Sequence, residues 1–544
     1  MIDGHRMNDN VYDAVLIGET FPLDMGLVER VEVIRGPGSA LYGGSAFFAV
    51  VNIITRQAGA LGGVEGDVEG ASLGTYRARG TGGWTIGRDY ELLISASHFD
   101  RDGVSTLYFP EFDDPSTGLG VASRLDDESA SSLFGSGRIG AVQLRGAYSS
   151  RTKQVPTAAW GTLFGDPRLE TTDARGWIDA SLETSVGRTT VHGRTYVDYM
   201  GYRGTYPWET DGPADLDLSR GVWMGVDVMA SRTVATRHRL TVGGEYRHDG
   251  VLEQSYYVPA EESYYVNDER TASQAAAFVQ DEIAITTRLV ATVGARLDWW
   301  SAGEASSLRP RAGLVFRPQA NTALKVLYGE AFRPANAYER YYTDGSAPPT
   351  PHLKPESLQT TEVVVEHYVR GRLRLTAAAF HTHIEDLIEQ DPEDESGTVH
   401  INRGRANAAG LELEAEQRTA AGVLLRGSLV LQRASDRRTK DPLSNAPERL
   451  ATAQIAVPVA DRQVTLGLDA QFVGARLTRT GRTLDAFWRT NLIATWRPQG
   501  MLSVQAGVFN LFDATYAHPV GSELAQDAIV QDGRTASVRA RIRF

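Results

Sequence analysis

From about residue 64 onward the chain repeats one pattern of hydrophobic and polar positions. Roughly ten residues alternate between apolar and polar, and a polar or glycine-rich break follows, close to the ~9–11 residues that a tilted strand needs to cross a bilayer. In VTLGLDAQF, for example, Leu466 and Leu468 alternate with Thr465, Gly467 and Asp469. Because successive side chains of a strand point to opposite faces, each segment is predicted to be a ribbon with one apolar and one polar face.

The polar faces of these ribbons are charged again and again. LVATVGARLDWW (289–300), GLELEAE (410–416) and ASVRARIRF (536–544) all show this property. The strands of a soluble β-sandwich also alternate between apolar and polar residues, so that fold remains the alternative. Repeatedly charged faces favour a membrane barrel with a water-filled lumen. Aromatic residues at or near the segment ends, where an interfacial girdle would lie, favour it too: Trp299, Trp300, Trp488, Trp496, Tyr148 and Tyr199.

The length of the repeating region gives the size of the barrel. Roughly 480 residues at about 22 residues per strand and connection predict about 22 antiparallel strands, a size class whose lumen holds a plug. The longer breaks are predicted to be surface loops, at 102–130, 200–220, 250–270, 332–357 and 389–404.

Composition narrows the class of protein further. The chain has 55 Gly and 21 Tyr, which favour short strands and turns, and it has no Cys, which excludes a disulfide scaffold and a thiolate metal site. The sequence contains no run of about 18 apolar residues, so it predicts no transmembrane helix. A formal net charge of −13 argues against nucleic acid as a partner.

The first 57 residues follow another pattern, with mixed α/β character. Residues 28–36 alternate as a short strand, Gly36 and Gly38 permit a sharp turn, Ser39 can cap a brief helical turn, and VVNIITR reads as a strand buried on both faces. Neither GxGxxG nor GxxxxGK[ST] occurs, so a phosphate-binding enzyme is disfavoured. Composition shifts at 57–70, where we expect the domain boundary.

The segment ERVEVIRGPGSALYGGSAFFAVVNIITR (29–56) resembles the C-terminal half of the plug domain of TonB-dependent outer-membrane receptors. Later segments resemble the barrel of the same family in order: QAAAFVQDEI (274–283), HLKPESLQTTEVVVEH (352–367), NRGRANAAGLELEAE (402–416) and NLFDATY (510–516). The resemblance implies an all-β transmembrane barrel with a partial α/β plug in its lumen. Its expected divisions are the plug half at 1–57, a connection at 58–63 and the barrel at 64–544.

The resemblance also implies a function. We expect an outer-membrane receptor, not an enzyme, for TonB-dependent active uptake of a scarce bulky nutrient, either a ferric siderophore or a cobalamin-like corrinoid. Its expected partners are TonB, outer-membrane lipid and the barrel-assembly machinery, which would read the terminal Phe544. A monomer without a cofactor is expected. A passive channel and a surface-binding barrel not coupled to TonB are the alternatives.

The family begins with a signal peptide, a TonB-coupling box and the first half of the plug. MIDGHRMNDN matches none of these and has no apolar region of a signal peptide. We therefore expect the sequence to be a fragment, or to start at an internal methionine.

Two groups of residues are candidates for function on this resemblance. In the family, plug arginines pair with barrel glutamates, and the resemblance therefore implies that Arg35 pairs with Glu362 and Glu412. Loss of one partner of such a buried set would lower stability by roughly 3–5 kcal/mol. The alternative is that the two glutamates only face lumen water. Substrate contacts are predicted in an apical plug loop and in tyrosine pairs, which can stack on a ligand or pack loop against loop: Asn10, Tyr12, Asp13, Glu19, Tyr256, Tyr257, Tyr341 and Tyr342. Tyr42 is interpreted as structural.

Haem receptors of the family carry a histidine near a FRAP…NPNL box. Here FRPA and HLKP stand near His352, but the order departs from that pattern, so haem is a minor alternative. We predict no resident metal ion and no catalytic residues.

Overall fold

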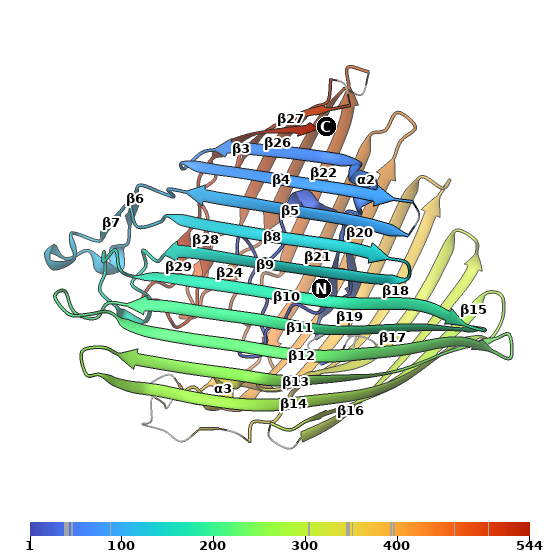
Figure 1. Cartoon of the computed structure of the whole chain (residues 1–544), viewed down its shortest axis with the longest axis horizontal. Coiled ribbons are helices and arrows are strands. Elements are labelled where there is room, and N and C mark those ends of the chain that lie inside the picture. The colour runs from blue at the N-terminus through green and yellow to red at the C-terminus, as the bar shows by residue number, and fades with distance from the viewer. Residues whose placement is uncertain are drawn as a thin grey trace.

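A closed barrel of antiparallel strands encloses the N-terminal residues (Figure 1). The computed structural model describes residues 1–36, 43–44, 47–87, 89–302, 305–343, 349–350, 352–391, 394, 398–461, 463–498 and 500–544. The ring contains 22 strands, which confirms the predicted fold class and strand number. Closure satisfies the backbone hydrogen bonds of every strand, as a sheet in lipid requires.

The barrel strands, in chain order, are β3 (Gly63–Ala71), β4 (Thr75–Ile86), β5 (Tyr90–Arg101), β8 (Glu128–Ile139), β9 (Val142–Gln154), β10 (Glu170–Val186), β11 (Thr189–Tyr206), β12 (Asp215–Val234), β13 (His238–Val258), β14 (Ser263–Ala284), β15 (Leu289–Trp300), β16 (Ala305–Gln319), β17 (Thr322–Arg333), β18 (Glu356–Val369), β19 (Leu373–Gln390), β20 (His400–Arg418), β21 (Leu424–Asp436), β22 (Arg449–Val459), β23 (Val464–Val473), β26 (Phe487–Trp496), β27 (Leu502–Phe509) and β30 (Thr535–Arg543).

The two ends of the barrel differ. At one end, which we call the turn end, tight turns join neighbouring strands; at the other, the loop end, most connections are longer (Figure 1). These connections carry small elements: β6 (Thr106–Tyr108), η2 (Pro110–Phe112), η3 (Pro115–Thr117), β7 (Val121–Ser123), η4 (Ala159–Gly161), α3 (Ala337–Tyr341), β24 (Arg476–Leu477), β25 (Thr483–Leu484), β28 (Ala517–Pro519) and β29 (Ala528–Val530).

Two of the predicted loops are mostly strand. β11 and β12 leave only residues 207–214 between them, and β13 and β14 leave only 259–262. The interpretation of 200–220 and 250–270 as loops was therefore wrong. With β14 reaching 22 residues, these strands are much longer than a bilayer crossing requires.

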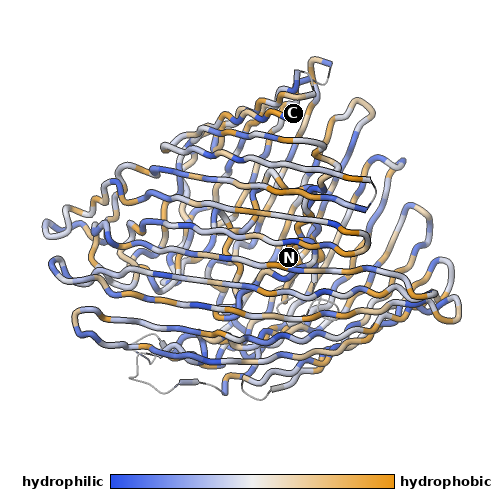
Figure 2. The backbone as a smooth tube through the Cα atoms, viewed as in Figure 1, coloured by the Kyte–Doolittle hydropathy of each residue, from blue (hydrophilic) through white to orange (hydrophobic). Residues whose placement is uncertain are grey.

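The alternation of the sequence becomes the two faces of the wall. Figure 2 shows hydrophobic and hydrophilic positions alternating along the strands. Trp299 on the outer face is 44% exposed, whereas the next residue, Trp300, is 5% exposed and packs edge-on against Phe332 at 4.8 Å between ring centroids. Trp300 therefore does not belong to an outer aromatic girdle, because consecutive strand residues point to opposite faces.

The barrel closes where the first strand meets the last. β3 pairs antiparallel with β30, and the Phe544 backbone N–H donates to the Val64 carbonyl at 2.8 Å. The Phe544 side chain is 74% exposed on the outer surface.

The N-terminal segment inside the barrel contains η1 (Met25–Leu27), the hairpin of β1 (Val28–Arg35) and β2 (Ala49–Thr55), and α2 (Ala58–Leu61). β2 is not buried on both faces as expected, because its two-stranded sheet leaves Val51 exposed. The predicted Ser39 cap and Tyr42 lie outside the described residues. None of the helices in the described part of the chain is long and apolar enough to cross a membrane.

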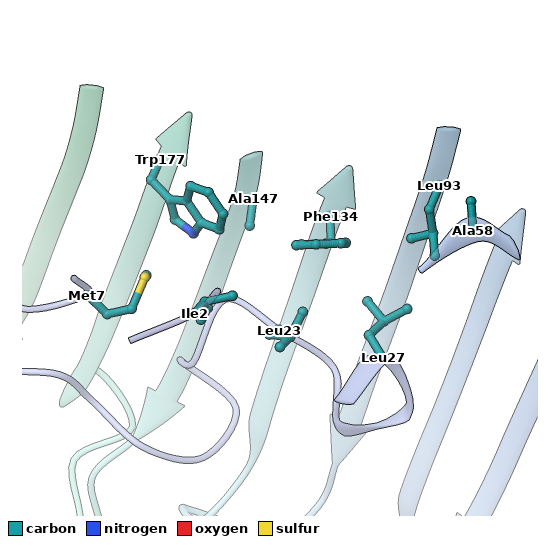
Figure 3. Close-up of a cluster of buried hydrophobic side chains, with 9 residues drawn as sticks. All are labelled: Ile2, Met7, Leu23, Leu27, Ala58, Leu93, Phe134, Ala147 and Trp177. Atoms are coloured by element: carbon teal, nitrogen blue, oxygen red, sulfur yellow. The ribbon is translucent and has the colours of Figure 1, made fainter. Parts of the chain in front are cut away.

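This segment packs on one side of the barrel through an apolar core (Figure 3). Ile2, Met7, Leu23 and Leu27 face side chains from four consecutive barrel strands. The wall and connection residues of this core are Leu93, Phe134, Ala147, Trp177 and Ala58. Burial of each of the larger side chains stabilises the fold by about 1.5–3 kcal/mol. Apolar contact therefore fixes the segment to this part of the wall.

Candidate functional site

A cavity of about 1260 Å³ opens toward the loop end, between the plug segment and the loops; we call it the outer cavity. Its lining residues come from the plug (between Met7 and Pro22), from β10–β14, and from the connections that contain Trp160, Trp208, Tyr338 and Ser522. Nine of the described lining residues are tyrosine or tryptophan, and large concave sites of this kind are where proteins bind bulky ligands.

One wall of the outer cavity is a chain of aromatic rings from the barrel and its loops. Trp160 meets Tyr206 edge-on at 5.2 Å, Tyr206 stacks with Tyr256 at 6.4 Å, and Tyr256 meets Tyr265 at 6.2 Å. The Trp208 Nε1–H donates to the Tyr256 hydroxyl at 2.8 Å. This hydrogen bond fixes the ring at the centre of the wall.

A second part of the lining combines the plug with α3. The rings of Tyr12 and Tyr338 lie 5.6 Å apart, and those of Tyr338 and Tyr342 lie 4.7 Å apart. α3 is held by a capping box in which Asn336 and Glu339 bond each other's backbone N–H, and the Asn336 amide also donates to the Tyr12 carbonyl at 2.8 Å. Burial raises the pKa of Tyr338 to about 12, so its hydroxyl stays protonated at neutral pH.

The plug turn at residues 9–14 forms the floor of the outer cavity. The Asp9 carboxylate accepts hydrogen bonds from the backbone N–H of Val11, Tyr12 and Ala14, at 2.8, 2.6 and 3.2 Å. Burial raises the pKa of Asp9, although these hydrogen bonds act in the opposite direction. One carboxylate therefore sets the shape of the turn.

Beside this turn lies a second cavity of about 890 Å³, which we call the inner cavity. It lies between the plug, the wall formed by β9 and β11–β15, and the segment from Phe332 to Tyr341. Among the described lining residues, seven arginines are matched by seven carboxylates: Arg6, Arg145, Arg194, Arg247, Arg270, Arg296, Arg340, Asp3, Asp9, Asp13, Asp227, Glu245, Asp249 and Asp298. Asp9 lines both cavities, so the turn it organises separates them.

The structure divides the predicted substrate residues among several places. Tyr12, Tyr256 and Tyr342 line the outer cavity. Asn10, Asp13 and Tyr341 line the inner cavity.

The other two predicted substrate residues line neither cavity. Glu19 accepts a hydrogen bond from Arg77 at 2.5 Å, which joins the plug to β4, and Tyr257 packs on Tyr264 with ring centroids 4.9 Å apart. The first contact joins the plug to the barrel, and the second joins β13 to β14.

Several residues that line the outer cavity escaped the sequence analysis: Trp160, Tyr202, Tyr206, Trp208, Asp217 and Tyr338. YRGTYPW at 202–208 carried a signal, because three aromatic residues fall at the end of a strand. The sequence carried no signal for Asp217, since a single acidic residue in a strand usually indicates only that it faces the lumen.

Arg35 lies toward the turn end and pairs with β20. It donates to Glu412 at 2.8 Å and also to Glu414, which the sequence did not indicate. Glu362 lies beside Gly36, where an added Cβ would be 3.5 Å from Glu362 Oε2, and Gly36 has φ +75°. Burial lowers the pKa of Arg35, but the carboxylates of Glu414, Glu412 and Glu362 reverse this effect and raise it overall.

A second ionic network, which we call the seam network, joins the plug to β3, β4 and β30. Arg79 on β4 donates to Glu65 on β3 at 2.7 Å and lies 3.2 Å from Asp24 of the plug. Arg56 of the plug adds a contact to Glu65 at 3.1 Å. The Arg79 and Glu65 side chains are fully buried, unlike Arg35, whose side chain is 46% exposed. The seam network is therefore more desolvated than the contact of Arg35 with β20.

The His, Asp and Glu side chains of the described part of the chain bear on metal binding. No group of three or more His, Asp or Glu side chains there is arranged to hold a metal ion. His352 is solvent-exposed.

Comparison with known proteins identifies both parts of the chain. Residues 62–511 match the family described as TonB dependent receptor-like, beta-barrel, and residues 1–50 match the TonB-dependent Receptor Plug Domain. The vitamin B12 transporter BtuB of Vibrio vulnificus is 23% identical over 100% of this chain and 84% of its own length. The ferric-pyoverdine M114 receptor PbuA of a Pseudomonas species is 22% identical over 93% of this chain and 69% of its own length.

Solved structures share the fold. The ferric enterobactin receptor PfeA of Pseudomonas aeruginosa, in a mutant form, superposes with a TM-score of 0.81 at 16% identity, over 100% of this chain and 90% of its own. The FrpB iron transporter of Neisseria meningitidis gives 0.78 at 17% identity, over 100% and 91%. One family model matches most of the barrel, and the plug-domain model matches the enclosed segment. The chain therefore belongs to the TonB-dependent receptors, which are outer-membrane receptors and transporters and not enzymes.

Proposed function

We propose that this receptor takes up a ferric siderophore or a cobalamin-like corrinoid, which binds in the outer cavity before TonB-dependent transport. The observation that carries the proposal is the aromatic outer cavity, whose floor is a plug turn. Its volume of about 1260 Å³ suits a bulky ligand. The names of similar proteins, a vitamin B12 transporter and a ferric-pyoverdine receptor, support the same two substrate classes.

We assign roles to the parts of the chain on this basis. Residues 1–57 act as the plug, 58–63 as the connection and 64–544 as the barrel, working as a monomer. The loop end faces the exterior, as short turns in such barrels face the periplasm. Force from TonB acts on the plug, the apolar outer face contacts lipid, and the barrel-assembly machinery recognises the strand that ends at Phe544.

Binding to the purified full-length chain in detergent tests this proposal. Labelled ferric siderophores and cyanocobalamin would be titrated in equilibrium dialysis. Trp160→Ala should weaken binding at least tenfold. Trp488→Ala should not, because Trp488 lies on β26 outside the outer cavity and is similarly exposed, at 57% against 52%. Binding of none of these ligands, or equal effects of the two substitutions, would overturn the proposal.

A passive channel is the second candidate, and the inner cavity favours it. The described lining of that cavity holds equal numbers of arginines and carboxylates, and the plug turn of Asp9 lines both cavities. Steady large conductance steps of the unmodified chain in a planar bilayer would favour the channel. Near silence would favour the receptor.

A further inference from the structure

The outer cavity carries an unusual balance of charge. Its described lining residues include five carboxylates and one cation: Asp9, Asp173, Asp215, Asp217, Glu523 and Arg175. The inner cavity, in contrast, has equal numbers of arginines and carboxylates. The excess of acid is therefore a property of the outer cavity and not of the whole lumen.

Arg175, the one cation among the described lining residues, is already engaged. Arg175 donates to Asp198 at 2.5 Å, to the Gly176 and Tyr199 carbonyls at 2.6 and 3.0 Å, and to the Met7 carbonyl at 3.4 Å. All three guanidinium nitrogens take part in these contacts. Proteins bind multiply charged anions through arginine or lysine donors. The described lining of the outer cavity thus offers such an anion no uncommitted cationic donor.

One carboxylate of this lining has an oxygen without a hydrogen-bond partner. Asp217 accepts a hydrogen bond from Tyr342, yet its Oδ1 is buried without a hydrogen-bond partner. Burial raises the pKa of Asp217 to about 7, so a cation beside it would favour the ionised carboxylate. Asp215 lies two residues away on the same face of β12 and accepts from the Tyr256 hydroxyl at 3.0 Å. Tyrosine and tryptophan rings beside carboxylates form the environment that attracts organic cations.

We propose that the outer cavity selects a ferric tris-hydroxamate chelate, neutral or carrying a pendant ammonium group, and disfavours the tris-catecholate class. Three singly charged hydroxamates cancel the charge of one ferric ion, whereas three doubly charged catecholates leave a multiply charged anion. The acidic lining repels that anion, and the aromatic walls and the Asp217 carboxylate accommodate an ammonium arm. This inference rests on the proposed function and specifies its substrate.

A charge series on one scaffold tests the inference. The probes are a linear ferric trihydroxamate with a terminal amine, its N-acetylated form and its N-succinylated form, which differ in charge and share one iron centre. Binding to the full-length chain should weaken along this order, by roughly tenfold or more between the amine and the succinylated form at low salt. A synthetic ferric tris-catecholate should bind more weakly still, and added salt should narrow the differences.

Variants assign the effect to the cavity. In the Asp215→Asn/Asp217→Asn double variant, which keeps the amide oxygens as acceptors for Tyr256 and Tyr342, the charge preference should shrink to about threefold or less. Asp441→Asn, at an exposed loop-end position outside the cavity lining, should leave the preference unchanged.

The remaining outcomes separate this inference from the proposed function. The inference would be overturned by equal or tighter binding of the tris-catecholate, by binding of a corrinoid alone, or by a charge preference that survives the double substitution. Each of these results would leave the proposed siderophore or corrinoid uptake standing. Failure of every chelate and corrinoid to bind would overturn the proposed function itself.

Discussion

The Tyr12 hydroxyl lies 2.8 Å from Ser219 Oγ, a side chain 207 positions further along the sequence. This contact joins the apical plug turn to barrel strand β12. The same strand carries Asp217, which hydrogen-bonds to Tyr342 of the loop after α3. Plug, barrel and loop therefore meet within three residues of β12, at the edge of the outer cavity.

Tyr12→Phe removes one hydrogen bond while keeping the ring contact with Tyr338. Because a hydrogen bond of this type contributes about 1 kcal/mol, the plug turn should open roughly fivefold more often. Hydrogen exchange of the amides at residues 11–14 measures this opening. Tyr257→Phe, which alters a ring that lines neither cavity, is the matched control. Unchanged exchange in Tyr12→Phe would show that the ring alone holds the turn.

Asp9 should make the plug turn sensitive to pH. Burial raises its pKa above the ordinary value of about 3.9, so its ionisation acts against the folded turn. Protection of residues 11–14 is then fullest at low pH and is lost as pH rises through the raised pKa. In Asp9→Asn, which cannot ionise, protection should not vary in this way. The measurement is hydrogen exchange corrected for intrinsic rate; wild-type protection that increases with pH would contradict the prediction.

The Arg35 contact and the seam network should differ in strength. The Arg35 side chain is 46% exposed, so its carboxylate pairs are screened by water, and Arg35→Gln should destabilise docking of the plug by about 1 kcal/mol. The expectation of roughly 3–5 kcal/mol for a fully buried set does not fit this exposure. Arg79→Gln, at a side chain that is 0% exposed, should have that larger effect of about 3–5 kcal/mol.

Protease sensitivity of the plug in the two assembled variants, over a range of urea, compares these effects. Heat-modifiable migration in gels reports whether each variant still forms a barrel. Equal sensitivity of the two folded variants would contradict the difference expected from desolvation.

The plug turn should also act as the barrier between the cavities. Replacing residues 10–13 with glycine removes the Tyr12 contacts and should turn a nearly silent protein into one with steady conductance steps in planar bilayers. Glycine replacement of residues 259–262, a loop of the same length on the barrel, should not do so. A silent plug variant would place the barrier deeper in the plug.

Phe544 is predicted to be part of the assembly signal of the last strand. Its side chain is 74% exposed, so Phe544→Ala removes little packing and should still lower the amount of assembled receptor in the outer membrane several-fold. Phe512→Ala is the control, because Phe512 lies in a loop and is 76% exposed. Heat-modifiable migration in gels measures assembled barrel, and equal yields would remove Phe544 from the signal.

The barrel could be predicted from the sequence because a strand has a period of two. Outer residues such as Leu411 and inner residues such as Glu412 follow from their order along the chain, and the number of segments then sets the size of the barrel. The identity of the plug came from one long motif. Tyr12, Tyr256 and Tyr342 could be suggested as ligand residues because they stand near strand ends or in an apical loop.

Three-dimensional packing decided the remainder. Alternation marks a residue as facing the lumen, but it does not say which lumen residue meets the plug and which meets water. Leu93 and Phe134 contact the plug, Asp217 lines the outer cavity and Arg79 is buried in the seam network, although all four face inward. The sequence by itself determined the two faces of the wall, because they depend on neighbouring residues. The outer cavity and the seam network depended on tertiary structure, because their residues come from positions hundreds of residues apart.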